Sequence, residues 1–193
     1  ALDAREYKAL LEAAEGQPPA WGPRDAAVVA LMGLGGWRVS TVTALNVSDL
    51  GIHGAHRTIS YSGKGEKRSS APLVPTTLAY LDAHLSARRA LGPVDSGEPL
   101  LLANDGGRLS RDQVERILVR CAKAAGLHDP AKVRPHVLRA TFATLAKLAG
   151  VDLWELQEAM DHADPRTTQQ YEQAERRLSD APTYVVATFL LST

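Results

Sequence analysis

A histidine and an arginine lie three residues apart at the start of a predicted helix, and together they could bind an anion. The segment from Arg134 reads RPHVLRATFATLAKLAG. Pro135 favours the first helical turn, because the amide hydrogen that proline lacks would be unpaired there anyway. His136 and Arg139 then share one face near the positive end of the helix dipole. These groups favour phosphate, although such a pair on a helix is more often an ordinary surface or core pair.

Four further side chains could carry chemistry, and each has a simpler explanation when taken alone. Arg38 follows a Gly-Gly break in GLGGWRVS, where a buried helix ends and a short one begins; an arginine among apolar neighbours needs a partner. Lys64 stands in Gly-Lys-Gly at the tip of a predicted hairpin, where a lysine is normally only solvated. His162 and Tyr171 lie nine residues apart across a predicted helix start, and such a tyrosine usually serves packing.

The elements that must position these residues are mainly helices. Capping boxes, in which an N-cap oxygen and a side chain three residues on satisfy the first free amides, predict helix starts at Asp3, Ser110 and Asp152. A leucine stripe predicts a further helix within residues 75–92, and the apolar run 23–34 predicts a largely buried one.

Residues 51–74 are the exception to this helical pattern. RTISYS, GKGE and KRSSAPLV are typical of a strand, a glycine-bracketed turn and a second strand. Residues 92–105 favour a loop between helices. We therefore expect a mainly α protein with a small antiparallel β-hairpin or sheet, in the α+β class.

The length and composition fit one globular domain, 1–193, with a single core. Of the 193 residues 45% are apolar and 23% charged, which excludes a disordered or fibrous chain. No stretch approaches the ~18 apolar residues of a membrane span. The single cysteine, Cys121, lies on an apolar helix stripe, so we expect it in the core. It excludes an internal disulfide and a multi-cysteine metal cage, and it favours a reducing compartment such as the cytoplasm.

The charges are balanced in number but uneven along the chain. Lys plus Arg and Asp plus Glu each total 22, so net charge alone predicts no nucleic-acid partner. Residues 1–151 contain 19 basic and 14 acidic side chains, whereas residues 152–193 contain 3 and 8. A basic body could bind phosphates, although a solvated charged face is the commoner explanation.

Taken together, six polar residues resemble the signature of the tyrosine recombinases, the phage-integrase family of site-specific DNA recombinases. Their order, the elements that carry them and their local spacings all match, and the resemblance covers nearly the whole chain. The six residues are Arg38, Lys64, His136, Arg139, His162 and Tyr171. The resemblance implies the catalytic-domain fold of that family.

The resemblance also implies cleavage and rejoining of DNA strands through a 3′-phosphotyrosyl intermediate, with neither metal nor cofactor. Such a reaction needs a nucleophile, charge stabilisation and a proton for the leaving oxygen. Tyr171 would attack the scissile phosphate, while Arg38 and Arg139 would clamp its non-bridging oxygens. The covalent link keeps the phosphodiester bond energy, so rejoining needs no ATP.

The remaining three positions of the signature would handle protons and hydrogen bonds. The resemblance implies that His136 assists proton transfer at the tyrosine and that Lys64 protonates the leaving 5′-oxygen. His162 would hydrogen-bond the phosphate. The enzyme class that follows is a tyrosine site-specific recombinase, a DNA strand transferase.

Three departures from the family pattern keep alternatives open. Thr41, Ala140 and Asp161 stand where the family usually has glutamate, histidine and glycine. They motivate the alternative of a DNA-binding homologue with weakened catalysis. A type IB topoisomerase, which relaxes supercoils by similar chemistry, is another alternative. A metal site, at His53 and His56 or at His136 with His162, is a weak alternative, and no carboxylate or thiol accompanies the first pair.

The implied partner is double-stranded DNA, bound as a homo-tetramer by a chain that is monomeric in solution. The candidate phosphate contacts are Arg57, Lys67, Arg68, Arg108, Arg111, Arg116 and Lys132. Family members usually carry an N-terminal core-binding domain, which we expect to be absent from this chain. The apolar tail 181–193 could fold back on its own core or dock into a neighbouring subunit. We expect no membrane association and a DNA-associated protein of the bacterial cytoplasm.

Overall fold

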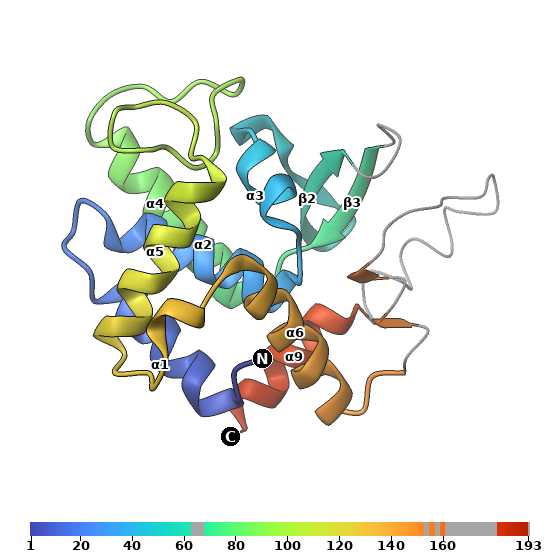
Figure 1. The fold of residues 1–193 in the computed structure, drawn as a ribbon. Coiled ribbons are helices and arrows are strands. Elements are labelled where there is room, and N and C mark those ends of the chain that lie inside the picture. The colour runs from blue at the N-terminus through green and yellow to red at the C-terminus, as the bar shows by residue number, and fades with distance from the viewer. Residues whose placement is uncertain (63–67, 153–154, 157–158, 161–180, 193) are drawn as a thin grey trace.

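The computed structural model describes residues 1–62, 68–152, 155–156, 159–160 and 181–192, and these form a helical protein with one small sheet (Figure 1). The described elements, in chain order, are α1 (Ala4–Glu15), α2 (Gly22–Gly35), α3 (Val39–Ala44), the 3-10 helix η1 (Val47–Asp49), β1 (Leu50–His53), β2 (His56–Ser62), β3 (Arg68–Pro72), α4 (Pro75–Arg89), α5 (Arg111–Ala124), the 3-10 helix η3 (Pro130–Lys132), α6 (Pro135–Leu148) and α9 (Pro182–Leu191). The expected α+β class is confirmed.

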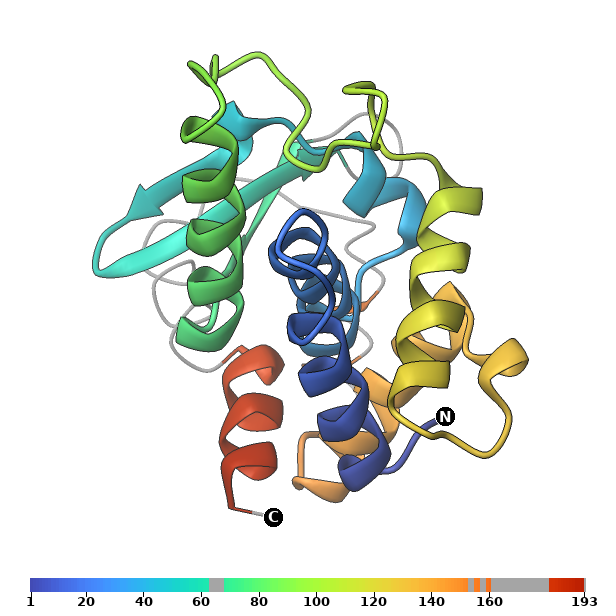
Figure 2. The same cartoon turned by 90° about the vertical axis from the view of Figure 1, so that its left-hand side faces the viewer.

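Helix α2 forms the centre of the helical part, with α1, α4, α5, α6 and α9 packed against it (Figure 2). From residue 26 to residue 34 its sequence is apolar on all sides, as a buried helix requires, and nearly all residues of the helix are buried. A Cβ on Gly33 would lie 2.1 Å from the ring of Tyr7, so only glycine lets α1 approach this closely. The predicted buried helix is confirmed.

Local sequence signals explain where α1 and α5 begin. Asp3 Oδ1 accepts a hydrogen bond from the Glu6 amide at 2.8 Å, and Ser110 Oγ accepts one from the Gln113 amide at 3.3 Å. Both capping boxes are therefore confirmed. Cys121 lies in the core as expected, and burial raises its pKa to about 12, which keeps the thiol protonated and unreactive. The helix predicted from Asp152 is described only at residues 155–156 and 159–160, which are helical.

The sheet has three antiparallel strands in the order β1-β2-β3, one more than expected. The predicted hairpin is confirmed as β2 and β3, with Ser62 opposite Arg68 and Ile59 opposite Ala71. Strand β1 was not predicted because its residues are exposed or half-exposed and therefore show no apolar alternation. Pairing with β2 holds β1 in place, with Leu50 opposite Ile59.

The connection 92–105 is irregular, as expected, and α4 holds it against the core. His84 Nε2 lies 3.0 Å from the Leu100 carbonyl oxygen, and Arg88 donates to the same oxygen at 3.0 Å. Arg88 also forms an ion pair with Glu98. Burial lowers the pKa of His84 to about 4, so the ring is neutral and donates through Nε2.

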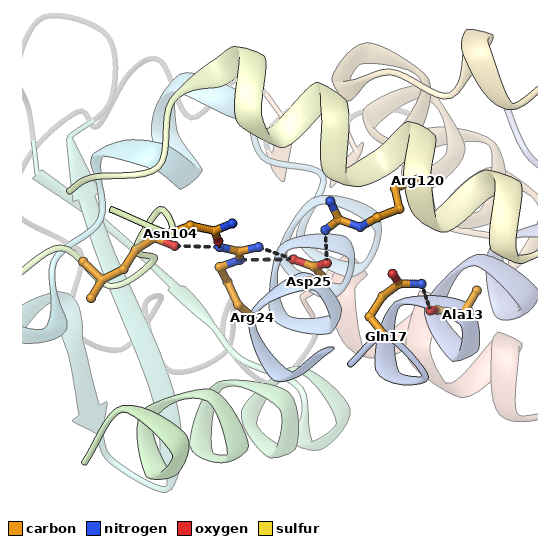
Figure 3. A network of polar contacts seen from close by, with 7 residues as sticks. Ala13, Gln17, Arg24, Asp25, Asn104 and Arg120 are labelled. Atoms are coloured by element: carbon orange, nitrogen blue, oxygen red, sulfur yellow. Dashed lines mark hydrogen bonds and ion pairs between the residues drawn. The ribbon is translucent and has the colours of Figure 1, made fainter. Parts of the chain in front are cut away.

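A buried charge network joins α2 to α5 and to the end of the irregular connection 92–105 (Figure 3). The fully buried Asp25 receives hydrogen bonds from Arg24 at 3.0 and 3.1 Å and from Arg120. Arg24 also donates to the Leu102 carbonyl oxygen at 3.1 Å and to Asn104 Oδ1 at 2.8 Å. Two cations thus surround one buried carboxylate, and each extra contact reduces the cost of burying them.

The C-terminal helix α9 packs against α2 and α6 of its own chain. Thr183 Oγ1 donates to the Leu34 carbonyl oxygen, and Val186 and Leu190 are buried. Tyr184 Oη lies 3.0 Å from His56 Nδ1, which joins α9 to the sheet. Residues 181–192 therefore cover the core of the chain that carries them. Across the described part of the chain, no helix has the length and apolarity needed to cross a membrane.

Candidate active site

The structure describes three of the six residues of the implied site. Arg38, His136 and Arg139 have defined positions, whereas Lys64 and the pair His162 and Tyr171 lie outside the described residues. The strands on either side of Lys64 are described, so the base of its hairpin can be placed.

Arg38 is positioned by a turn in which glycine is required. Helix α2 ends at Gly36, whose φ of 64° is left-handed, and a Cβ there would lie 2.4 Å from Cδ1 of Phe142 in α6. Two residues later Arg38 is the extended N-cap of α3 and is exposed. Between them Trp37 is buried against Tyr61 of β2, with ring centroids 5.9 Å apart. The turn thus anchors one side chain inward and exposes the next, Arg38.

Arg139 binds the same turn from α6. Its Nη1 donates to the Gly36 carbonyl oxygen at 2.6 Å, and its Nη2 donates to the Met160 carbonyl oxygen at 2.6 Å. The side chain is half-buried. Because carbonyl oxygens are neutral acceptors, these two bonds fix the plane of the guanidinium without cancelling its charge. The contact joins the elements that carry Arg38 and Arg139.

His136 lies at the exposed start of α6, as predicted. Pro135 is in the first turn and is buried, while His136 is exposed. The N-cap residue of α6, Arg134, makes no side-chain cap in the part of the chain that the structure describes. His136 and Arg139 lie three residues apart in a regular helix and therefore share one face.

The base of the Lys64 hairpin lies beside α3. The contact between Trp37 and Tyr61 joins β2 to the turn before α3. A polar hollow of about 320 Å³ lies between the two elements and is lined by Thr41 of α3, Ser62 of β2 and Arg68 of β3, among others. The base of the hairpin and α3 therefore line one hollow.

The three departures from the family pattern fall in different surroundings. Thr41 lines the hollow, Ala140 is exposed on α6, and Asp161 lies outside the described residues.

Several predicted phosphate contacts already have partners in the protein. Arg68 forms an ion pair with Asp49 at 2.8 Å, and Arg111 forms one with Glu115 at 3.4 Å. Lys132 forms an ion pair with Asp129 at 2.5 Å, which raises the pKa of Lys132. All three basic side chains are well exposed, so DNA contact stays a prediction for each.

Arg108 has a structural role that the sequence did not reveal. It donates to the carbonyl oxygens of Thr43 and Leu45, each at 3.0 Å, and to Asn46 Oδ1 at 2.5 Å. These groups lie at the C-terminal end of α3, where helix carbonyls need donors. No local signal could have found the contact, because the partners lie more than 60 positions away along the chain.

The other predicted contacts differ in exposure and in description. Arg57 is exposed on β2, and the exposed Arg116 donates to the Asp112 carbonyl oxygen at 3.3 Å. Lys67 lies outside the described residues.

The described residues offer no group of three or more ligands that could hold a metal ion. His53 and His56 face each other at the β1–β2 turn, and His56 is hydrogen-bonded to Tyr184. His56 is therefore part of the contact between the sheet and α9.

Known proteins with similar sequences and folds provide an independent comparison. Residues 1–177 match the model of the phage integrase family. The tyrosine recombinase XerD of Mycobacterium tuberculosis is 36% identical over 175 residues, which cover 86% of this chain and 54% of that protein. The chain thus spans about half the length of the curated relatives it matches.

Solved structures agree in fold. The XerH site-specific recombinase bound to difH substrate, in a pre-cleavage complex, aligns with a TM-score of 0.71 at 26% identity, covering 84% of this chain and 47% of XerH. The lambda integrase catalytic core aligns with a TM-score of 0.60 at 24% identity, covering 86% of this chain and 94% of that core.

Proposed function

Because its residues 1–177 match the family model, this chain belongs to the phage integrase family, and we propose that it performs the strand cleavage and rejoining of a site-specific DNA recombinase. Its fold is that of tyrosine-recombinase catalytic domains. The observation that carries the proposal is the bond from Arg139 to the Gly36 carbonyl oxygen, because it joins the elements of two site arginines from distant parts of the sequence.

The two arginines would stabilise the charge that develops on the phosphate. Arg38 is exposed at the start of α3, and Arg139 is held by carbonyl oxygens next to the same turn. Guanidinium groups held in advance at the non-bridging oxygens need little reorganisation in the transition state. His136, one turn before Arg139, would accept the proton of the attacking hydroxyl.

The nucleophile and the proton donor are assigned by their place in the family pattern. The Tyr171 oxygen would form a bond to the scissile phosphorus, and the bond from phosphorus to the 5′-oxygen would break. Lys64 would protonate the leaving oxygen, and His162 would hydrogen-bond the phosphate. The product is a 3′-phosphotyrosyl link and a free 5′-hydroxyl, and attack by another 5′-hydroxyl reverses the step.

Double-stranded DNA is the proposed partner. XerH was solved with difH substrate and a lambda integrase dimer with a COC' core site, so related proteins bind such DNA. The exposed basic side chains of Arg57 and Arg116 are the phosphate contacts that we consider first. We further propose a homo-tetramer on DNA, a monomer in its absence, and a location with the DNA of a bacterial cytoplasm.

Covalent trapping tests the proposed function. The protein and its Tyr171→Phe variant are incubated with nicked suicide duplexes of randomised sequence, and SDS-resistant adducts are then measured. We expect an adduct with the wild type and none with Tyr171→Phe, whose DNA affinity should be nearly unchanged because only one hydroxyl is lost. Sequencing the trapped DNA would identify the target.

Two outcomes would contradict the proposal. An adduct formed by Tyr171→Phe would exclude this nucleophile. If both this protein and a longer natural form of it bind the DNA pool but form no adduct, the result would favour the DNA-binding homologue with weakened catalysis. The type IB topoisomerase alternative is not favoured, because the relatives found are named as recombinases and integrases.

A further inference from the structure

A continuous chain of polar contacts runs along the base of the Lys64 hairpin. Arg108 donates to Asn46 Oδ1 at 2.5 Å, the Asn46 amide donates to Asp49 Oδ2 at 2.9 Å, and Arg68 donates to Asp49 Oδ1 at 2.8 Å. These hydrogen bonds thus link the segment before α5 to η1, and η1 to β3.

Asp49 is the most firmly held residue in this series of hydrogen bonds. Its side chain is only 14% exposed, and both of its carboxylate oxygens accept hydrogen bonds. Asn46 and Asp49 form a capping box around η1, which holds the backbone on either side of the carboxylate. Arg68, in contrast, is 68% exposed and reaches Asp49 from the hairpin.

Because of where Arg68 lies, this ion pair helps to position the strands of the hairpin. Arg68 pairs with Ser62, and these two residues bracket the segment that contains Lys64. Strand β3 is not adjacent to β1 in the sheet, so Arg68 must reach across β2 to bind Asp49 just before β1. The ion pair therefore ties the far strand of the hairpin to the opposite edge of the sheet.

On the side of α3, the packing of Tyr61 of β2 against Trp37 also holds the described strands of the hairpin. The hollow of about 320 Å³ separates the base of the hairpin from Ser40 and Thr41 of α3, and Asp49 and Arg68 lie on its lining. Space of this size permits the ends of β2 and β3 at Ser62 and Arg68 to shift when the ion pair is lost. At the other end of this series of hydrogen bonds, Arg108 donates to the carbonyl oxygens at the C-terminal end of α3, the helix whose N-cap is Arg38.

We propose that Asp49 and Arg68 are positioning residues that hold the hairpin where Lys64 can protonate the leaving 5′-oxygen. This inference rests on the proposed function. It assigns Arg68 to the hairpin rather than to a DNA phosphate. Because Arg68 is largely exposed, the ion pair contributes little to global stability, so its loss should shift the strands that flank Lys64 without unfolding the protein.

The test compares cleavage of two duplexes of the trapped target sequence under single-turnover conditions. One has an ordinary 5′-oxygen leaving group, and the other has a 5′-bridging sulfur, which leaves without protonation. We expect Asp49→Asn and Arg68→Gln each to slow cleavage of the oxygen duplex about tenfold, because a misplaced acid loses part of its effect. Cleavage of the sulfur duplex should stay within about twofold of wild type, as it should for Lys64→Ala.

Two controls distinguish a positioning effect from the mere loss of a positive charge and from independent effects of the two substitutions. Arg89→Gln removes an exposed positive charge at the end of α4 and should leave both rates unchanged. The double variant Asp49→Asn/Arg68→Gln should be no slower than either single variant, because the two residues act through one contact.

The outcomes distinguish the inference from the function on which it rests. Equal slowing of both duplexes would overturn the positioning role. The positioning role would also be overturned if Asp49→Asn cleaved the oxygen duplex at the normal rate while Arg68→Gln bound DNA more weakly. That result would make Arg68 a phosphate contact. If the wild type cleaves neither duplex through Tyr171, the proposed function fails, and the inference fails with it.

Discussion

At the scale of single residues, the way Arg139 is held matters most for the proposed chemistry. Two carbonyl oxygens, of Gly36 and Met160, fix the guanidinium at 2.6 Å each. Lysine has one nitrogen and could not reproduce this planar fork. The close approach depends in turn on Gly36, because any side chain there would meet the ring of Phe142.

Gly36→Ala should therefore destabilise the protein and weaken catalysis together. Gly36 has a φ of 64°, and an added Cβ would lie 2.4 Å from Phe142 Cδ1, so strain and overpacking both contribute. We expect the free energy of unfolding to fall by about 3 kcal/mol, measured by urea denaturation.

Gly126→Ala is the matched control for this prediction. Gly126 has a φ of 68°, but a Cβ there would meet nothing within 4 Å. It should lose only the cost of the strained backbone, about 1 kcal/mol. Equal losses in the two variants would show that the contact with Phe142 is not the reason for glycine at position 36.

At the scale of elements, helix α4 and the connection 92–105 behave as one unit. His84 and Arg88 bind the Leu100 carbonyl oxygen, and the chain then leads to Arg108, which holds the end of α3. A neutral, buried histidine is thus part of the support for the helix that begins at Arg38. Protonation of His84 should loosen that support.

The stability of the protein should fall in mild acid because of His84. Burial lowers its pKa from the ordinary 6.5 to about 4, so the unfolded state binds the proton more readily. The contribution is fully present above pH 6.5 and is lost as the pH falls towards 4. The shift corresponds to about 3 kcal/mol.

His84→Gln isolates this contribution, because glutamine can donate to the same carbonyl but does not titrate near these pH values. We expect urea unfolding between pH 7 and pH 4 to show a steeper loss of stability in the wild type than in the variant. Parallel pH profiles would mean that His84 is not held neutral in the folded protein.

At the scale of the whole molecule, both ends of the described chain pack on the core formed by α2 and α6 (Figure 2). The Leu2 amide donates to Thr141 Oγ1 of α6 at 2.8 Å, and Leu2 is buried. Helix α9 covers α2 and α6 with Val186 and Leu190. The tail that a partner subunit could receive is thus part of the core of its own chain in this structure.

Val186→Ala should lower the free energy of unfolding of the protein by about 1–2 kcal/mol, because removing part of a fully buried side chain leaves a cavity. Leu191→Ala is the control in the same helix. Leu191 is 81% exposed, so its loss should change stability by less than about 0.5 kcal/mol. Thermal or urea unfolding without DNA measures both, and an unaffected Val186→Ala would show that α9 leaves the core in solution.

The sequence alone was sufficient for features that depend on neighbouring residues. The capping boxes at Asp3 and Ser110, the proline at the start of α6, the core position of Cys121 and the β2–β3 hairpin were all predicted. Each depends on hydrogen bonds or apolar spacing within a few residues, which sequence patterns record directly.

Only the tertiary structure revealed the features that join distant segments. Strand β1 forms because β2 pairs with it, and its own residues carry no clear signal. Three contacts join residues that lie 19 to 103 positions apart in the sequence. They are the hydrogen bond from Arg139 to the turn before Arg38, the hydrogen bonds from Arg108 to the end of α3, and the Asp49–Arg68 ion pair. Such contacts depend on how helices and strands pack in space, and a local pattern of residue types does not contain that information.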